Sequence, residues 1–139
     1  MKKNPVPQGK YRPAARYGNL IFSAGMTPRK DGKLLFSGKI KADDTPEMWR
    51  EAVRQAADNA LTAIRNCLEE GESIRQILNM TVYINTAPDF RTHAAIGDLA
   101  SEYLCEELGE AGIGARACIG MATLPGDAPV EIQLVAAAE

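Results

Sequence analysis

The feature that most constrains this chain is a long segment, from Thr45 to about Glu70, in which apolar residues recur at helical spacing. Thr45 can cap such a helix, Pro46 suits its first turn and Gly71 suits its end. An apolar stripe of this length must be buried against another layer of structure. The stripe consists of Trp49, Val53, Ala56, Ala57, Ala60, Leu61, Ile64 and Leu68.

Strand-like segments lie on both sides of this helix. Residues 14–25 predict two short strands that turn at Gly18 and Asn19, and residues 31–38 predict a third strand bounded by glycines. Residues 77–85 alternate apolar and polar side chains, which is typical of a half-buried strand.

The last third of the chain predicts one more helix and two strands. Asp89 is expected to open a helix that runs through Leu108 and ends in the glycines that follow. Residues 115–122 and 130–137 are expected to pair as a hairpin closed by residues 124–129.

The resulting order, β-β-β-α-β-α-β-β, favours an α+β fold in which right-handed crossovers place both helices on one face of a sheet. The other face would be left uncovered by this chain. With 139 residues, of which 45% are hydrophobic, we expect a single domain spanning residues 1–139. Residues 1–13, which contain three prolines, predict an extended N-terminal arm.

Composition excludes several classes of function. The formal net charge is −2 and the 16 Lys and Arg residues are spread along the chain, so nucleic acid binding is not expected. Three widely spaced cysteines without a C-x-x-C pair argue against a disulfide framework or a zinc site, and His93, the one histidine, receives no role. The absence of a long apolar run predicts a cytoplasmic protein with no membrane contact, and no motif indicates a metal or another cofactor.

The strand at 115–122 carries a lone cation among small and apolar residues. By alternation Arg116 and Cys118 share one face, and the expected hairpin would place Glu131 on that same face. One interpretation is a structural ion pair at a subunit contact. The other is a small-molecule site, because a guanidinium binds a carboxylate through two parallel hydrogen bonds. Cys118 itself could be a nucleophile or a small buried thiol.

Three stretches resemble the Rid (reactive intermediate deaminase) family, which is also called YjgF. They are GNLIFSAG at 18–25, LNMTVYINTAPDF at 78–90 and ARACIGMATLPGDAPVEIQLVA at 115–136. The resemblance implies a chorismate-mutase-like fold and a homotrimer whose sheets form a central barrel, with clefts between subunits.

The resemblance also implies an activity, the hydrolysis of small 2-imino acids to 2-keto acids and ammonia. Arg116 would bind the substrate carboxylate and Glu131 would position or activate the water. Cys118, Ala24 and Gly25 would line the pocket, and Tyr11 on the arm would close it. Two alternatives stay open: a non-catalytic module that binds a carboxylated metabolite such as a 2-keto acid, and the family's older label of endoribonuclease or translation inhibitor.

The chain departs from many deaminating members at several positions. Their I-x-x-S-G-Q pattern reads here with Ala24 and Met26 in place of the serine and the glutamine. Ser23 does not substitute for that serine, because a shift of one residue along a strand turns the side chain to the other face. Ala94 lies near the place of an asparagine, and Gly114 stands where a proline usually precedes the Ala-Arg pair.

Overall fold

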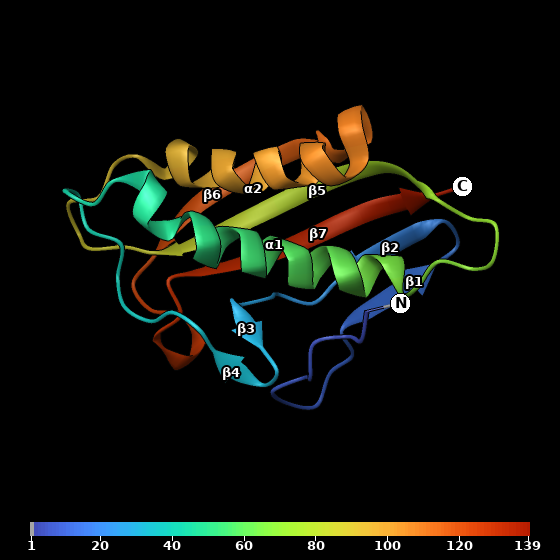
Figure 1. Ribbon diagram of the computed structural model, residues 1–139, viewed down its shortest axis with the longest axis horizontal. Coiled ribbons are helices and arrows are strands. Elements are labelled where there is room, and N and C mark those ends of the chain that lie inside the picture. The colour runs from blue at the N-terminus through green and yellow to red at the C-terminus, as the bar shows by residue number, and fades with distance from the viewer. Residues whose placement is uncertain (1) are drawn as a thin grey trace.

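A computed structural model describes residues 2–139 of the chain (Figure 1). The amphipathic segment forms a 3-10 turn, Pro46–Trp49, followed by helix α1 (Arg50–Arg65). The helix ends five residues before the expected Glu70, and the side chain of Thr45 forms no capping hydrogen bond. Five alanines lie on the buried side of α1 and let it approach the sheet closely: Ala52, Ala56, Ala57, Ala60 and Ala63.

The main sheet has five strands in the order β1-β2-β7-β5-β6. Neighbouring strands are antiparallel except β5 and β6, which run parallel. Parallel pairing needs a crossover, and α2 (His93–Leu108) supplies it. The strands are β1 (Ala14–Tyr17), β2 (Leu20–Ser23), β5 (Ile74–Asn85), β6 (Ala115–Met121) and β7 (Val130–Ala138).

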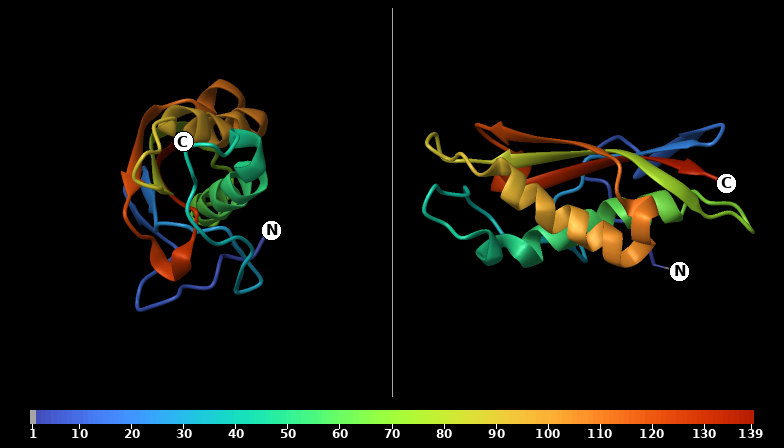
Figure 2. Two further views of the ribbon diagram at one scale, coloured as in Figure 1. Left: turned by 90° about the vertical axis from the view of Figure 1, so that its left-hand side faces the viewer. Right: turned by 90° about the horizontal axis from the view of Figure 1, so that it is seen from above.

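Both helices cover the same face of this sheet, as expected (Figure 1). Figure 2 shows the strands in one layer and the helices in a second layer beneath them. Exposed ion pairs join the two helices: Arg50 to Glu102 at 3.1 Å, Arg54 to Glu106 at 2.7 Å and Arg65 to Glu107 at 2.8 Å. The opposite face, called the open face below, carries none of the helices formed by residues 2–139.

The predicted third strand is a separate small hairpin. Strands β3 (Arg29–Lys30) and β4 (Lys33–Leu34) pair with each other outside the main sheet. Asp31 and Gly32 between them have φ angles of 54° and 78°. A type I′ turn requires positive φ at both central residues. The Asp-Gly dipeptide therefore makes this segment a tight hairpin, where strand propensity alone predicted one continuous strand.

The expected hairpin of β6 with β7 is wrong. Strand β5 lies between the two, and β6 pairs with β5 alone. The connection from Met121 to Val130 crosses the end of β5 through a 3-10 turn, Pro125–Asp127. The helix α2 begins at His93 and not at Asp89, because the backbone N–H of the buried Phe90 closes a turn on Ala87 first. It ends, as expected, at a glycine, Gly109, which has a φ of 64° and opens a 3-10 turn, Gly109–Gly112.

Candidate functional site

Arg116 projects from β6, the edge strand, toward helix α2. Its Nη1 donates to Oδ1 of Asp98 at 2.9 Å and to Oγ of Ser101 at 3.0 Å, and its Nη2 donates to the carbonyl of Ala94 at 3.5 Å. The three partners are spaced by one helical turn each on α2 and therefore share a face. The side chain of Arg116 is 24% exposed, and that of Asp98 is 65% exposed. Arg116 is thus held at the edge of the sheet, and part of its guanidinium remains accessible.

Gly97 allows α2 to lie against this arginine. A Cβ on Gly97 would stand 2.3 Å from Sγ of Cys118 and 3.0 Å from Cζ of Arg116. Any other residue would displace one of these side chains. Burial raises the pKa of the Cys118 thiol, more than the neighbouring Arg116 lowers it. The thiol is therefore protonated at neutral pH, which favours the interpretation of Cys118 as pocket lining over that of a nucleophile.

Glu131 lies in a second cluster on the open face, in the middle of the sheet. It pairs with Tyr83 across β7 and β5, and a Cβ on Gly25 would stand 2.3 Å from its Oε2. Burial raises the pKa of the Glu131 carboxyl, and no salt bridge within residues 2–139 opposes that effect. This is the behaviour of a carboxyl that can accept and return a proton.

The expectation that Arg116 and Glu131 share a face is wrong. Arg116 is level with Met80 and Glu131 is level with Tyr83 on the same strand, β5. Met80 is buried under the helices, and residues an odd number of positions apart point to opposite faces. Arg116 and Cys118 do share a face with each other, but that face is the helix side. The error follows directly from the missing β6–β7 hairpin.

The other residues expected to line the pocket lie near Glu131 and Gly25 or on the N-terminal arm. Ala24 is half-buried beside Gly25, and Met26 is in the core, where its backbone pairs with Ile132. Ser23 is buried on the helix side and its hydroxyl accepts from the N–H of Leu134.

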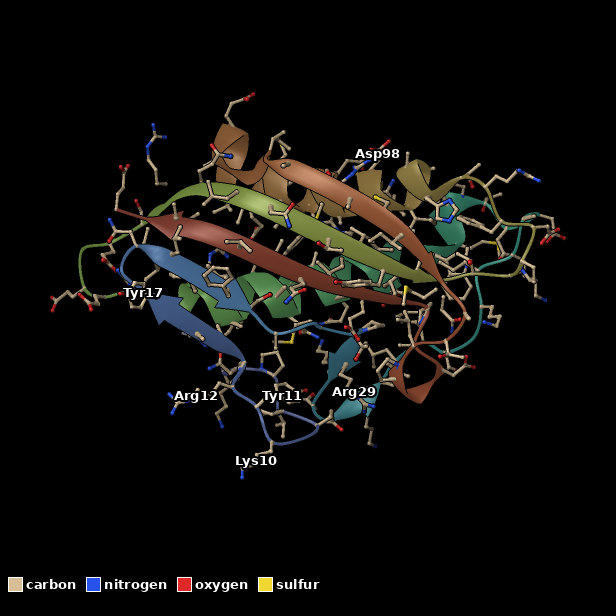
Figure 3. The ribbon with its side chains drawn as sticks, turned by 180° about the vertical axis from the view of Figure 1, so that it is seen from behind. Lys10, Tyr11, Arg12, Tyr17, Arg29 and Asp98 are labelled. Atoms are coloured by element: carbon tan, nitrogen blue, oxygen red, sulfur yellow. The ribbon has the colours of Figure 1, made fainter. Side chains whose placement is uncertain are left out.

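Tyr11 is 47% exposed, and its hydroxyl accepts from the N–H of Gln8. Figure 3 looks onto the open face and shows Tyr11 on the arm outside β1, while Asp98 lies beyond β6 at the other edge of the sheet. One chain therefore does not bring Tyr11 close to the Arg116 cluster.

Sequence reasoning missed the residues that hold Arg116. Asp98 and Ser101 carried no motif, and the signal that could have found them is their spacing from Ala94 on one helix face. Within residues 2–139 no group of three or more His, Cys, Asp and Glu could hold a metal ion. None of the helices described is long and apolar enough to cross a membrane.

Comparisons with known proteins agree with this architecture. The model of the family described as Endoribonuclease L-PSP matches residues 1–138. A 2-iminobutanoate/2-iminopropanoate deaminase of Dermatophagoides farinae is 27% identical over 97% of this chain and 91% of the relative.

Two solved structures have the same fold. A protein of unknown function from Agrobacterium tumefaciens superposes with a TM-score of 0.86 at 29% identity, over 96% of this chain and 86% of that one. The crystal structure of E. coli TdcF with bound serine superposes with a TM-score of 0.68 at 25% identity, over 96% of this chain and 92% of that one.

Proposed function

Since the chain belongs to the Endoribonuclease L-PSP family, which includes relatives named as imino acid deaminases, we propose that it hydrolyses small 2-imino acids to 2-keto acids and ammonia. The observation that carries the proposal is the tethered guanidinium of Arg116. Its Nη1 donates to Asp98 and Ser101, and its Nη2 uses one of its two N–H groups for the carbonyl of Ala94, which leaves the other N–H of Nη2 for a substrate carboxylate. Serine, the molecule bound in the TdcF crystal structure, carries such a carboxylate, which supports a ligand of this class.

A complete site in this proposal needs two copies of the chain. Arg116 lies on the helix side at the β6 edge, whereas Glu131 and Gly25 lie on the open face. The open face carries exposed apolar side chains, among them Tyr17, Leu20, Phe22 and Ile119. Apolar surface of this kind supports burial against other copies. We propose a homotrimer in which Arg116 of one copy and Glu131 of the next border one cleft.

The reaction needs orientation and one proton acceptor. The carbon of an iminium is already electrophilic, so a water held beside it adds and forms the C–O bond while the C=N electron pair moves to nitrogen. Glu131 takes a proton from that water and returns it to the amine. The C–N bond then breaks, ammonia leaves, and the hydroxyl loses its proton to form the carbonyl of the 2-keto acid.

A binding module without chemistry is the second candidate, and one observation favours it. Ala24 places a methyl group where many deaminating members carry a serine hydroxyl, and Met26 is buried in the core and offers no polar group to the cleft. The contacts to the amino end of a substrate are therefore fewer here. An endoribonuclease activity has no support beyond the name of the family, since the net charge of the chain is −2.

The test is the release of 2-keto acid from imines generated in situ by an amino-acid oxidase. We expect the protein to accelerate release and Arg116→Ala to abolish the acceleration. Arg75→Ala is the matched control, because Arg75 is an exposed arginine paired with Glu139 at 3.4 Å near the start of β5. Binding of 2-keto acids without acceleration of any imine would favour the binding module instead. Acceleration that survives Arg116→Ala would contradict both candidates.

A further inference from the structure

A hollow of about 590 Å³ opens at the end of β6, close to the Arg116 cluster. Its polar lining consists of Lys39, Thr86 and His93, and Phe90 and Met121 add apolar surface. The lining contains no aspartate or glutamate. Asp89 lies between two lining residues in the sequence, and Asp127 accepts from the side chain of Asn85. A cation, an imidazole and a hydroxyl around one hollow are suited to an anion.

The imidazole of His93 is placed by a glycine. A Cβ on Gly120 would stand 2.7 Å from Nε2 of His93 and 3.1 Å from Oγ1 of Thr86. Glycine at this position therefore lets both polar groups lie directly over β6. The ring of His93 also packs against that of Phe90 in a T-shaped arrangement, with the centroids 4.9 Å apart. His93 is thus fixed with Nε2 at the hollow.

The ammonium of Lys39 is held at the same hollow by hydrogen bonds to a buried side chain and to a backbone carbonyl. It donates to Oδ1 of Asn85 at 2.8 Å and to the carbonyl of Ala122. Asn85 is fully buried, and its amide donates to Asp127 and to the carbonyl of Ala128. These bonds fix the direction of its Oδ1. An ammonium has three N–H groups, so one remains for a ligand.

The hollow lies on the same side of β6 as Arg116, farther along the strand. Arg116, Cys118 and Gly120 alternate along β6 and point to the same side. On the facing helix, the carbonyl that accepts from Nη2 of Arg116 belongs to Ala94, the residue that directly follows His93. The guanidinium also lies against Gly97, which is four residues and a rise of about 6 Å along α2 from His93, so the guanidinium and the imidazole lie at the same turn of the helix.

We propose that this hollow binds the second carboxylate of a dicarboxylic 2-imino acid whose first carboxylate is held by Arg116. The inference rests on the proposed function, because it assigns the class of substrate for that site. His93, Lys39 and Thr86 are then specificity-determining residues. The apolar surface of Phe90 and Met121 contacts the methylene groups between the two carboxylates.

The experiment compares the binding of two stable keto acids by calorimetry at one protein concentration. The probes are 2-oxoglutarate, with two carboxylates, and 2-oxobutanoate, with one. We expect wild type to bind 2-oxoglutarate about tenfold more tightly, the effect of one charge-assisted contact. Lys39→Met and His93→Phe should remove this preference and leave 2-oxobutanoate binding intact. Lys33→Met, at an exposed lysine of β4, is the matched control and should change neither.

Each other outcome is decisive. Equal affinity for the two keto acids, with both lost in Arg116→Ala, would overturn the dicarboxylate assignment and leave the proposed function standing. Binding of 2-oxoglutarate that survives Arg116→Ala but is lost in Lys39→Met would show a separate anion site and would also overturn it. If neither keto acid binds to wild type, the carboxylate anchor at Arg116 fails, and the proposed function fails with it.

Discussion

At the scale of the residue, Glu131 shows how a fold can raise the pKa of a carboxyl without a neighbouring charge. Burial alone raises its pKa, because removing the carboxylate from water disfavours the charged form. Gly25 contributes by leaving room for the carboxyl against the strand. A raised pKa also makes this residue a source of pH-dependent stability, which can be measured without any assay of activity.

We predict that Glu131→Gln changes the dependence of stability on pH. Between the ordinary pKa of a glutamate and the raised value, the folded wild type binds more protons than the unfolded chain, so its free energy of unfolding falls as pH rises. The variant lacks this fall. The difference in stability, variant minus wild type, should therefore increase from about pH 4 upward.

Urea unfolding at a series of pH values and one protein concentration measures that difference. Glu51→Gln is the control, because Glu51 is an exposed glutamate of α1. A difference between Glu131→Gln and wild type that does not vary with pH would contradict the raised pKa.

At the scale of the element, the position where β6 begins is set by a contact between backbones. A Cβ on Gly114 would stand 1.9 Å from the carbonyl oxygen of Ile77 and 3.2 Å from the carbonyl carbon of Leu78, at the irregular pairing of β5 with β7. Glycine is the residue that this close approach admits. The close approach fixes the start of β6, and with it the level of Arg116 along the sheet.

Replacing Gly114 by alanine should therefore destabilise the protein by about 1–3 kcal/mol, because backbone atoms cannot rotate away from the added methyl group. Gly114→Pro should be at least as harmful. Gly9→Ala, where the added Cβ would meet the ring of Tyr11 at an ordinary 3.5 Å, should stay within about 0.5 kcal/mol of wild type. Urea unfolding of the three variants measures this. Wild-type stability of Gly114→Ala would contradict the account of the β6 start.

The same element marks the limit of prediction from sequence. Alternation along residues 115–121 was enough to predict a strand in which Arg116 and Cys118 share a face. The pattern does not determine which strand lies beside it. A hairpin with residues 130–138 and a crossover from residues 74–85 both satisfy the same alternation. The connection that follows Met121 is long enough to close a hairpin or to cross the end of an intervening strand. The residues around Arg116 on α2 were missed for the same reason, since they depend on which side of the sheet the arginine faces.

At the scale of the whole molecule, the separation of Arg116 from Glu131 bears on how copies of the chain assemble. Arg116 is at the β6 edge on the helix side, and Glu131 is on the open face. A single chain cannot place both around one small substrate. The proposed function therefore requires that each site take Arg116 and Glu131 from different copies, and that closed symmetry repeat this arrangement around the assembly.

Mixing two inactive variants tests this requirement. Arg116→Ala and Glu131→Gln should each be inactive alone. When the two proteins are unfolded together and refolded as mixed assemblies, a site that takes Arg116 from a Glu131→Gln chain and Glu131 from an Arg116→Ala chain is intact. Random assortment makes about a quarter of the sites intact, so about a quarter of wild-type imine hydrolysis should return.

A preparation in which each variant is refolded separately and then combined should stay inactive as long as subunits do not exchange, which makes it the control. If each site were built from one chain, no mixture could restore activity, because every chain carries one defect. Absence of recovery in mixed assemblies of wild-type size would therefore contradict a site that is shared between copies.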